Sequence, residues 1–254
     1  MSNPFESSEF IADPSKLSLF IKDIAVKAEK KQVVKFYSQR FLKRKIKKIS
    51  LSMQAQNYIP IYSYILNFKK HKLTNKAWEN IETLVLKLEE VFEKISLNNI
   101  SLSYWLNFNK NKPSEILTKD EQRINFLINF HKRRISAQDL KKTIGTFALN
   151  PFELSNPRLK EYSQSQIKIL AQNAVDLKIP AKPTLREYIN KHGKDRFSIY
   201  SAMREELKWL AMEITADLRI NFLKIAKILI RRKIIEKQSD IFKFSFDEIK
   251  KFNK

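Results

Sequence analysis

The most regular hydrophobic pattern lies in the last third of the chain. Apolar side chains recur every three to four residues from Ile199 to Leu229, which is the spacing of one face of an α-helix. The pattern predicts one long amphipathic helix, longer than is usual in a compact domain.

Weaker stripes of the same period run through the rest of the chain. Asp13-Pro14 resembles a helix start, since aspartate caps free N–H groups and proline is tolerated in the first turn. A helix is predicted over 15–49, and a tyrosine-rich helix follows a break near Pro60. Further helices are predicted over 74–95, from 118 to the cluster at 131–134, and over 157–177.

Other segments lack this period. We expect a loop or internal boundary at the asparagine-rich stretch 98–113, irregular structure over 145–157 and a linker over 179–183. Residues 240–244 alternate like a short strand, and Ser245-x-x-Glu248 matches a capping box that opens a last helical turn.

These patterns predict an all-α fold, an irregular multi-helix domain with a long C-terminal amphipathic helix and a short extended segment near the C-terminus. The chain divides into a polar lead (1–13), an N-terminal helical part (14–110) and a C-terminal helical part (111–254). Only two glycines occur, Gly145 and Gly193, which disfavours hairpin-rich and phosphate-loop folds and excludes a Gly-rich nucleotide motif.

Composition excludes several kinds of chemistry. With no cysteine, the chain has no disulfide, thiolate nucleophile, zinc finger or iron–sulfur cluster. The histidines His71, His131 and His192 are scattered, so no metal site is predicted, and no nucleophile or metalloprotease motif occurs. We therefore expect no catalytic residues and no cofactor in this chain.

The N-terminal residues have early acids and no apolar core, so no signal peptide is predicted, and no apolar stretch is long enough to span a membrane. A cytoplasmic location is expected.

The formal net charge of +22 has two explanations. A cationic surface gains affinity for nucleic acid by releasing counterions from phosphates. The abundance of Lys, Asn, Ile and Phe also fits the codon bias of an AT-rich genome. The densest basic block is either a solvated helix face or a phosphate-binding face, formed by Arg40, Lys43, Arg44, Lys45, Lys47 and Lys48.

One C-terminal segment carries a recognisable order of motifs. Arg204-Glu205-Glu206 is followed by the rest of the long helix with Arg219, and the segment continues with Ile234-Ile235-Glu236, Asp240-Ile241-Phe242 and Phe244-Ser245-Phe246-Asp247-Glu248-Ile249. This order resembles the helical connector of the phosphoenolpyruvate synthase and rifampicin phosphotransferase family. Upstream, Phe126-Leu127-x-x-Phe130-x-x-Arg133 with Asp139-Leu140 is similar to a second element of that family.

The resemblance implies an acceptor-binding or scaffold domain. In that family, an ATP-grasp domain phosphorylates a mobile histidine domain, which transfers the phosphoryl group to the acceptor. Neither domain has a counterpart here, so the resemblance implies either a fragment of such an enzyme or a separately encoded domain whose partners are an ATP-grasp and a phosphohistidine domain. The positions carried over as candidate anion or domain-docking contacts are Arg133, Asp139, Arg204 and Arg219, each of which also fits a surface or helix-capping charge.

The family's glycines are replaced by His131 and Lys233, and its acid before Asp139 by Ala137. Two further hypotheses stay open: a basic helical protein that binds nucleic acid or another polyanion, and a degenerate gene product without activity.

Overall fold

The computed structural model describes residues 14–41, 60–108, 119–148, 151–175 and 196–252. Within these ranges the secondary structure is helical and no strand occurs, which confirms the all-α prediction. The predicted cap at Asp13, the end of the first helix beyond residue 41 and the linker at 179–183 lie outside the described residues.

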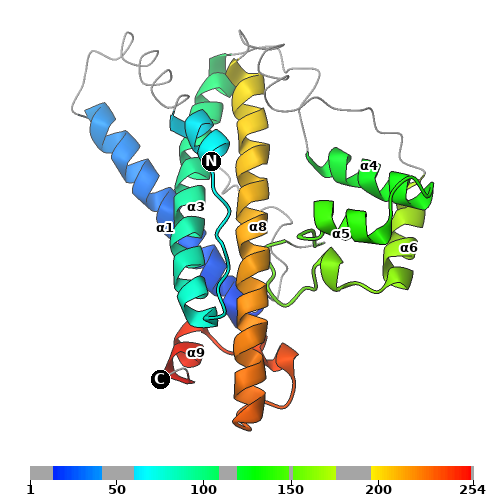
Figure 1. The fold of residues 1–254 in the computed structure, drawn as a ribbon. Helices are drawn as coiled ribbons and strands as arrows, with labels where there is room; N and C mark the ends of the chain where they lie inside the picture. The colour runs from blue at the N-terminus through cyan, green and yellow to red at the C-terminus, as the bar shows by residue number, and fades with distance from the viewer. Residues whose placement is uncertain (1–13, 42–59, 109–118, 149–150, 176–195, 253–254) are drawn as a thin grey trace.

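Three long helices form the main body (Figure 1). Helix α8 (Arg196–Arg231) has 36 residues and therefore a length of about 54 Å. Helix α3 (Ala77–Phe108) packs along α8, and α1 (Lys16–Phe41) packs against α3. A short helix over 60–67 and an extended connector over 68–76 lead into α3.

The long C-terminal helix is buried more broadly than a one-sided stripe implies. Leu207, Ile214, Leu218 and Phe222 are buried as the pattern predicts, on a helix that packs along α3. Polar side chains on other faces of α8 are also buried, namely Thr215, Asp217, Arg219 and Asn221. Helix α8 is therefore the central element of the fold.

Smaller helices lie to one side of α8 (Figure 1). They are α4 (Lys119–His131), α5 (Ala137–Ile144) and α6 (Gln164–Ala174), with the 3-10 helix η1 (Leu159–Glu161) between α5 and α6. The single helix predicted over 157–177 is thus two helices, because Ser163 caps the first turn of α6. The predicted start and end of α4 agree with the structure to within a residue.

The asparagine-rich stretch is not a loop up to residue 108, since α3 continues through it. Asn98 is fully buried, and its Nδ2 donates a hydrogen bond of 2.8 Å to the carbonyl oxygen of Tyr200 in α8. The prediction was wrong there because the amide nitrogen of a polar side chain bonds to a carbonyl on another helix, so that the residue is buried within α3 and not placed in a loop.

The predicted strand at 240–244 was also wrong. These residues belong to the 3-10 helix η2 (Gln238–Lys243), followed by Phe244 with extended backbone angles. Ile241 and Phe242 are neighbours in sequence and both are buried, so the alternating pattern does not correspond to alternating faces.

The capping box at the next helix is confirmed. In α9 (Phe246–Phe252), Ser245 N donates to Glu248 Oε2 at 2.6 Å and Glu248 N donates to Ser245 Oγ at 3.3 Å. This helix packs against α1.

Buried side chains from both sides of residue 110 belong to one hydrophobic core. The division of the chain at 110 stays a prediction about its organisation. None of the helices in the described part has an apolar stretch that could cross a membrane.

Candidate functional site

A surface pocket of about 850 Å³ lies between the end of α4, the start of α5 and one face of α6. Two of the four positions carried over from the family resemblance, Arg133 and Asp139, line it. The other polar groups in its lining include Arg134, Gln164, Lys168 and Gln172. The structure therefore brings together two predicted residues and several that the sequence did not indicate.

The turn after α4 places the arginines at the pocket. Arg133 N donates to Phe130 O and Arg134 N donates to Asn129 O, both at 2.9 Å, which is the hydrogen-bond pattern of a Schellman motif. The motif requires a left-handed residue, and Arg133 takes that position with φ 56°. His131, Arg133 and Arg134 are all exposed, so their charged or polar ends are open to a ligand.

Asp139 has a structural role at the start of α5. Its carboxylate accepts hydrogen bonds from Ser136 Oγ at 2.6 Å and Ser136 N at 3.2 Å, while Asp139 N donates to Ser136 Oγ. The hydrogen bonds from Ser136 hold the pKa of Asp139 below its usual value. Asp139 is therefore ionised at neutral pH and completes the capping box whose N-cap residue is Ser136.

The lining of the pocket combines exposed cations, which we call its rim, with apolar side chains. Arg133, Arg134 and Lys168 bring three positive charges to the lining, against the single carboxylate of Asp139. Among the apolar lining residues, Ala171 is buried, and Phe130 and Ile135 are partly buried. This combination suits a ligand that has an anionic group and an uncharged body.

Arg219 lies away from this pocket and is fully engaged in the fold. Its Nε and Nη2 each donate to a carboxylate oxygen of Glu161 at 2.9 Å, and its Nη1 donates to the carbonyl oxygen of Leu154. The guanidinium also lies 4.9 Å from the centre of the Phe242 ring. With 6% of its surface exposed, Arg219 fastens the 151–162 segment to α8.

A second buried arginine was not indicated by the sequence. Arg158 has no exposed surface and donates from Nη1 and Nη2 to the carbonyl oxygens of Glu153, Asn156 and Pro151. Burial lowers the pKa of Arg158 to about 10, with a further contribution from Arg219, so the guanidinium is still charged at neutral pH.

The two buried arginines are balanced by Glu153 and Glu161. Glu153 is 1% exposed and accepts hydrogen bonds from Ser15 Oγ at 2.6 Å and Ser15 N at 3.0 Å. We call Glu153, Arg158, Glu161 and Arg219 the charge cluster. It ties the 151–162 segment to α1 and α8, and no local motif in the sequence indicates it.

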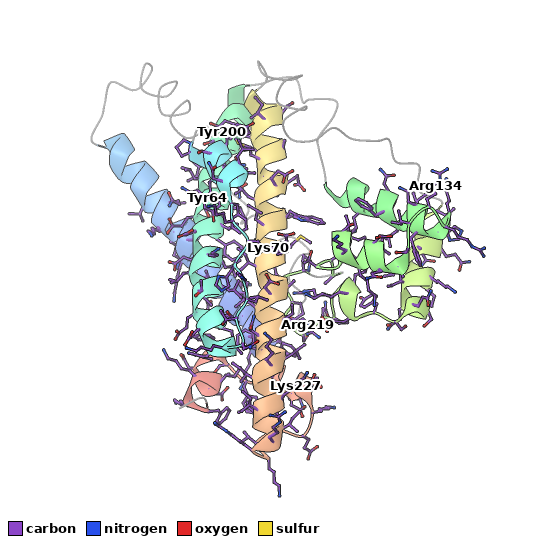
Figure 2. All side chains as sticks on the ribbon, viewed as in Figure 1. Tyr64, Lys70, Arg134, Tyr200, Arg219 and Lys227 are labelled. Carbon is purple, nitrogen blue, oxygen red and sulfur yellow. The ribbon has the colours of Figure 1, made fainter. Side chains whose placement is uncertain are left out.

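Arg204 is partly buried on α8, 15 residues before Arg219 and therefore about 22 Å from it along the helix. Figure 2 shows Arg134 and Arg219 in different parts of the molecule. The four predicted positions thus form no single site. The side chain of Arg40 and the whole of Lys43, Arg44, Lys45, Lys47 and Lys48 lie outside the described residues.

The histidines are also separated. His71 Nε2 lies 3.3 Å from Asn80 Oδ1, His131 lines the pocket, and His192 falls outside the described residues. The described part of the chain holds no group of three His, Cys, Asp or Glu side chains arranged to bind a metal.

Searches against protein-family models, curated proteins and solved structures found no match to this chain. The relationship to phosphoenolpyruvate-utilising enzymes stays a prediction from the sequence motifs.

Proposed function

We propose that this chain is a non-catalytic helical module that binds an anionic ligand in the α4–α5–α6 pocket. Its role is that of an acceptor-binding or scaffold part, related to phosphoenolpyruvate-utilising phosphotransferases, with the catalytic domains supplied by other chains. The observation that carries the proposal is the position of Arg133, Arg134 and Lys168 around one pocket.

The shape and charge of the pocket support an organic anion. Its volume of about 850 Å³ lies within the usual range for small-molecule sites. Arginine forms bidentate hydrogen bonds with carboxylates and phosphates, and the rim has two adjacent arginines. The strained backbone at Arg133 also supports a functional role, since strain of this kind is concentrated at ligand sites.

Ligand binding is tested by isothermal titration with inorganic phosphate and with phosphoenolpyruvate. We expect Arg134→Gln to weaken binding at least tenfold, because it removes a charged donor from the rim. Lys132→Gln is the matched control, since Lys132 is exposed in the same turn and does not line the pocket. Equal effects of the two variants, or no binding by the unmodified protein, would contradict the proposal.

The scaffold role is tested in the source cells. The native protein is purified with its partners, and the copurifying proteins are analysed for phosphohistidine under alkaline conditions. Recovery of a histidine-phosphorylated protein together with an ATP-grasp protein would support the proposed role. If neither protein copurifies from cells that express both of them, the scaffold role is overturned. The ligand-binding measurements on the pocket are not affected by that result.

A further inference from the structure

Exposed cations gather at the C-terminal end of α8 and on α9. We call this surface the basic end. All of its members are exposed, and they are Lys227, Arg231, Arg232, Lys233, Lys237, Lys250 and Lys251. Arg232 Nη1 donates to the carbonyl oxygen of Phe252 at 2.8 Å, which places the lysines of α9 beside the end of α8. Figure 1 shows α8 extending beyond the end of α3 here, and Figure 2 labels Lys227 on that portion.

The basic end is strongly cationic after its acids are taken into account. Of the four acids in residues 227–252, Asp240 pairs with Lys243 at 2.9 Å and Glu248 pairs with Lys16 at 3.5 Å. The remaining acids, Glu236 and Asp247, leave a surplus of five positive charges. The C-terminal end of a helix dipole carries about half a negative charge, so capping of α8 does not account for this surplus.

The turn that ends α8 concentrates the cations. Lys233 N donates to Ile230 O at 2.9 Å and Ile234 N donates to Leu229 O at 3.0 Å, with Lys233 in the left-handed region at φ 59°. This reversal directs the chain back toward η2, which packs against α8. Lys237 follows the reversal, so cations before and after the turn lie on the same end of the molecule.

The apolar groups at this end discriminate between classes of partner. Its exposed large apolar side chains are Ile228 and Ile234, each at 41%. The nearby phenylalanines, Phe244, Phe246 and Phe252, are partly buried and pack against the core. Insertion into a membrane interface uses a face of Trp, Phe or Leu, and single-stranded nucleic acid is held by exposed aromatic rings. Neither feature occurs in the described part of this end.

We propose that the basic end binds the phosphate backbone of double-stranded nucleic acid without reading its sequence. Lysine and arginine contacts to phosphates position a protein on a duplex but carry no base information. The proposal is independent of the pocket, which lies on the other helices, and of the basic block at 40–48.

The test measures affinity of the full chain for a fluorescent 20-base-pair DNA duplex between 50 and 200 mM KCl. We expect log K to fall linearly with log salt, with a slope of about −0.9 for each neutralised phosphate. The triple variant Lys227→Gln/Arg231→Gln/Lys250→Gln should reduce the magnitude of the slope by about three, or about one for each removed cation. A duplex of unrelated sequence should bind equally well.

The matched control is Lys27→Gln/Lys30→Gln/Lys142→Gln, which removes the same charge from exposed positions on α1 and α5. Its slope should equal that of the unmodified protein. The proposal is overturned if both triple variants lose affinity equally, if a single strand of the same length binds more tightly than the duplex, or if the unmodified protein does not bind at 50 mM KCl. Circular dichroism checks that each variant is folded.

Discussion

Arg133 and Lys233 are the described non-glycine residues with positive φ, at 56° and 59°. Each closes a helix through a Schellman motif, where glycine is the usual residue. A residue with a Cβ loses about 1–2 kcal/mol in this conformation, whereas a cation at a helix C-terminus recovers about 0.3–1 kcal/mol. Both residues belong to surfaces for which we propose anion binding.

The strain at Lys233 is measurable. Lys233→Gly should raise the free energy of unfolding by about 1 kcal/mol, because glycine adopts positive φ without a Cβ clash. Urea unfolding at pH 7 provides the measurement. Lys237→Gly is the control, since Lys237 has φ −134° and gains nothing from glycine. A less stable Lys233→Gly protein would show that the left-handed backbone is not strained.

Arg219 is the second residue whose role can be isolated. Arg219→Met should lower the free energy of unfolding by about 2 kcal/mol, because the buried Leu154 carbonyl and the partly exposed Glu161 carboxylate lose a charged donor. Lys227→Met, on the exposed part of the same helix, should change it by less than about 0.5 kcal/mol. If the two variants are equally stable, the ion pair with Glu161 contributes nothing to the fold.

At the scale of the elements, polar side chains fix how segments attach to the long helices. Asn80 of α3 is 1% exposed, and its Oδ1 accepts hydrogen bonds from Thr74 N and Thr74 Oγ1, both at 3.1 Å. Its Nδ2 donates to the carbonyl oxygen of Thr74 at 2.9 Å and to Asn221 Oδ1 of α8 at 3.0 Å. One amide therefore joins the 68–76 connector, α3 and α8.

Removal of this amide should loosen the connector. Asn80→Ala should destabilise the protein by about 2 kcal/mol, because it leaves the buried Oδ1 of Asn221 without its donor and removes three hydrogen bonds to Thr74. Asn75→Ala, at an exposed position of the same connector, is the control. Hydrogen exchange should show faster exchange over 68–76 in Asn80→Ala alone. Unchanged exchange there would mean that other contacts hold the connector.

The same elements show where sequence patterns succeed. The stripe at 199–229 and the Ser245 capping box depend on neighbours along the chain, and the structure has a helix and a box at those positions. The loop predicted from 98 and the strand predicted at 240–244 were wrong because burial of Asn98 and Phe242 depends on contacts with α8 and the core.

At the scale of the whole molecule, the charge cluster joins α1, α8 and the 151–162 segment. Burial acts to raise the pKa of Glu153 and Glu161, but hydrogen bonds outweigh it and hold both pKa values below the usual 4.5. The donors are Ser15 and Ser155 for Glu153, and Arg219 and Arg158 for Glu161. The unfolded chain therefore binds protons more readily than the folded chain at these two sites.

This difference predicts acid sensitivity. A carboxyl group with a lowered folded pKa stabilises the fold above its unfolded pKa, and this contribution is lost as the pH falls below about 4.5. Urea midpoints measured from pH 7 to pH 3 should decrease over that window. The decrease should be smaller in Glu153→Gln/Glu161→Gln than in the unmodified protein. An identical decrease in both proteins would assign the effect to other carboxyl groups.

Asp217 should act in the opposite direction. Burial raises the pKa of Asp217, an effect that Lys70 and Lys160 only partly offset. Its charged form is therefore penalised in the folded state, and protonation stabilises the fold as the pH falls through the raised pKa. Asp217→Asn should raise the melting temperature at pH 7. At lower pH the variant should lack the stabilisation that the unmodified protein gains when Asp217 is protonated. A lower melting temperature at pH 7 would contradict the sign of the shift.

The sequence by itself determined the helical fold class, most of the segments that form helices and the excess of positive charge, because these follow from composition and from spacing within one or two turns. Tertiary structure decided which charged side chains are available to contact a ligand. It engaged Arg219 and Arg158 in the core, placed Arg133 and Asp139 at one pocket far from Arg219, and gathered the basic end. These outcomes depend on contacts between residues far apart in the chain, whose partners no local pattern specifies.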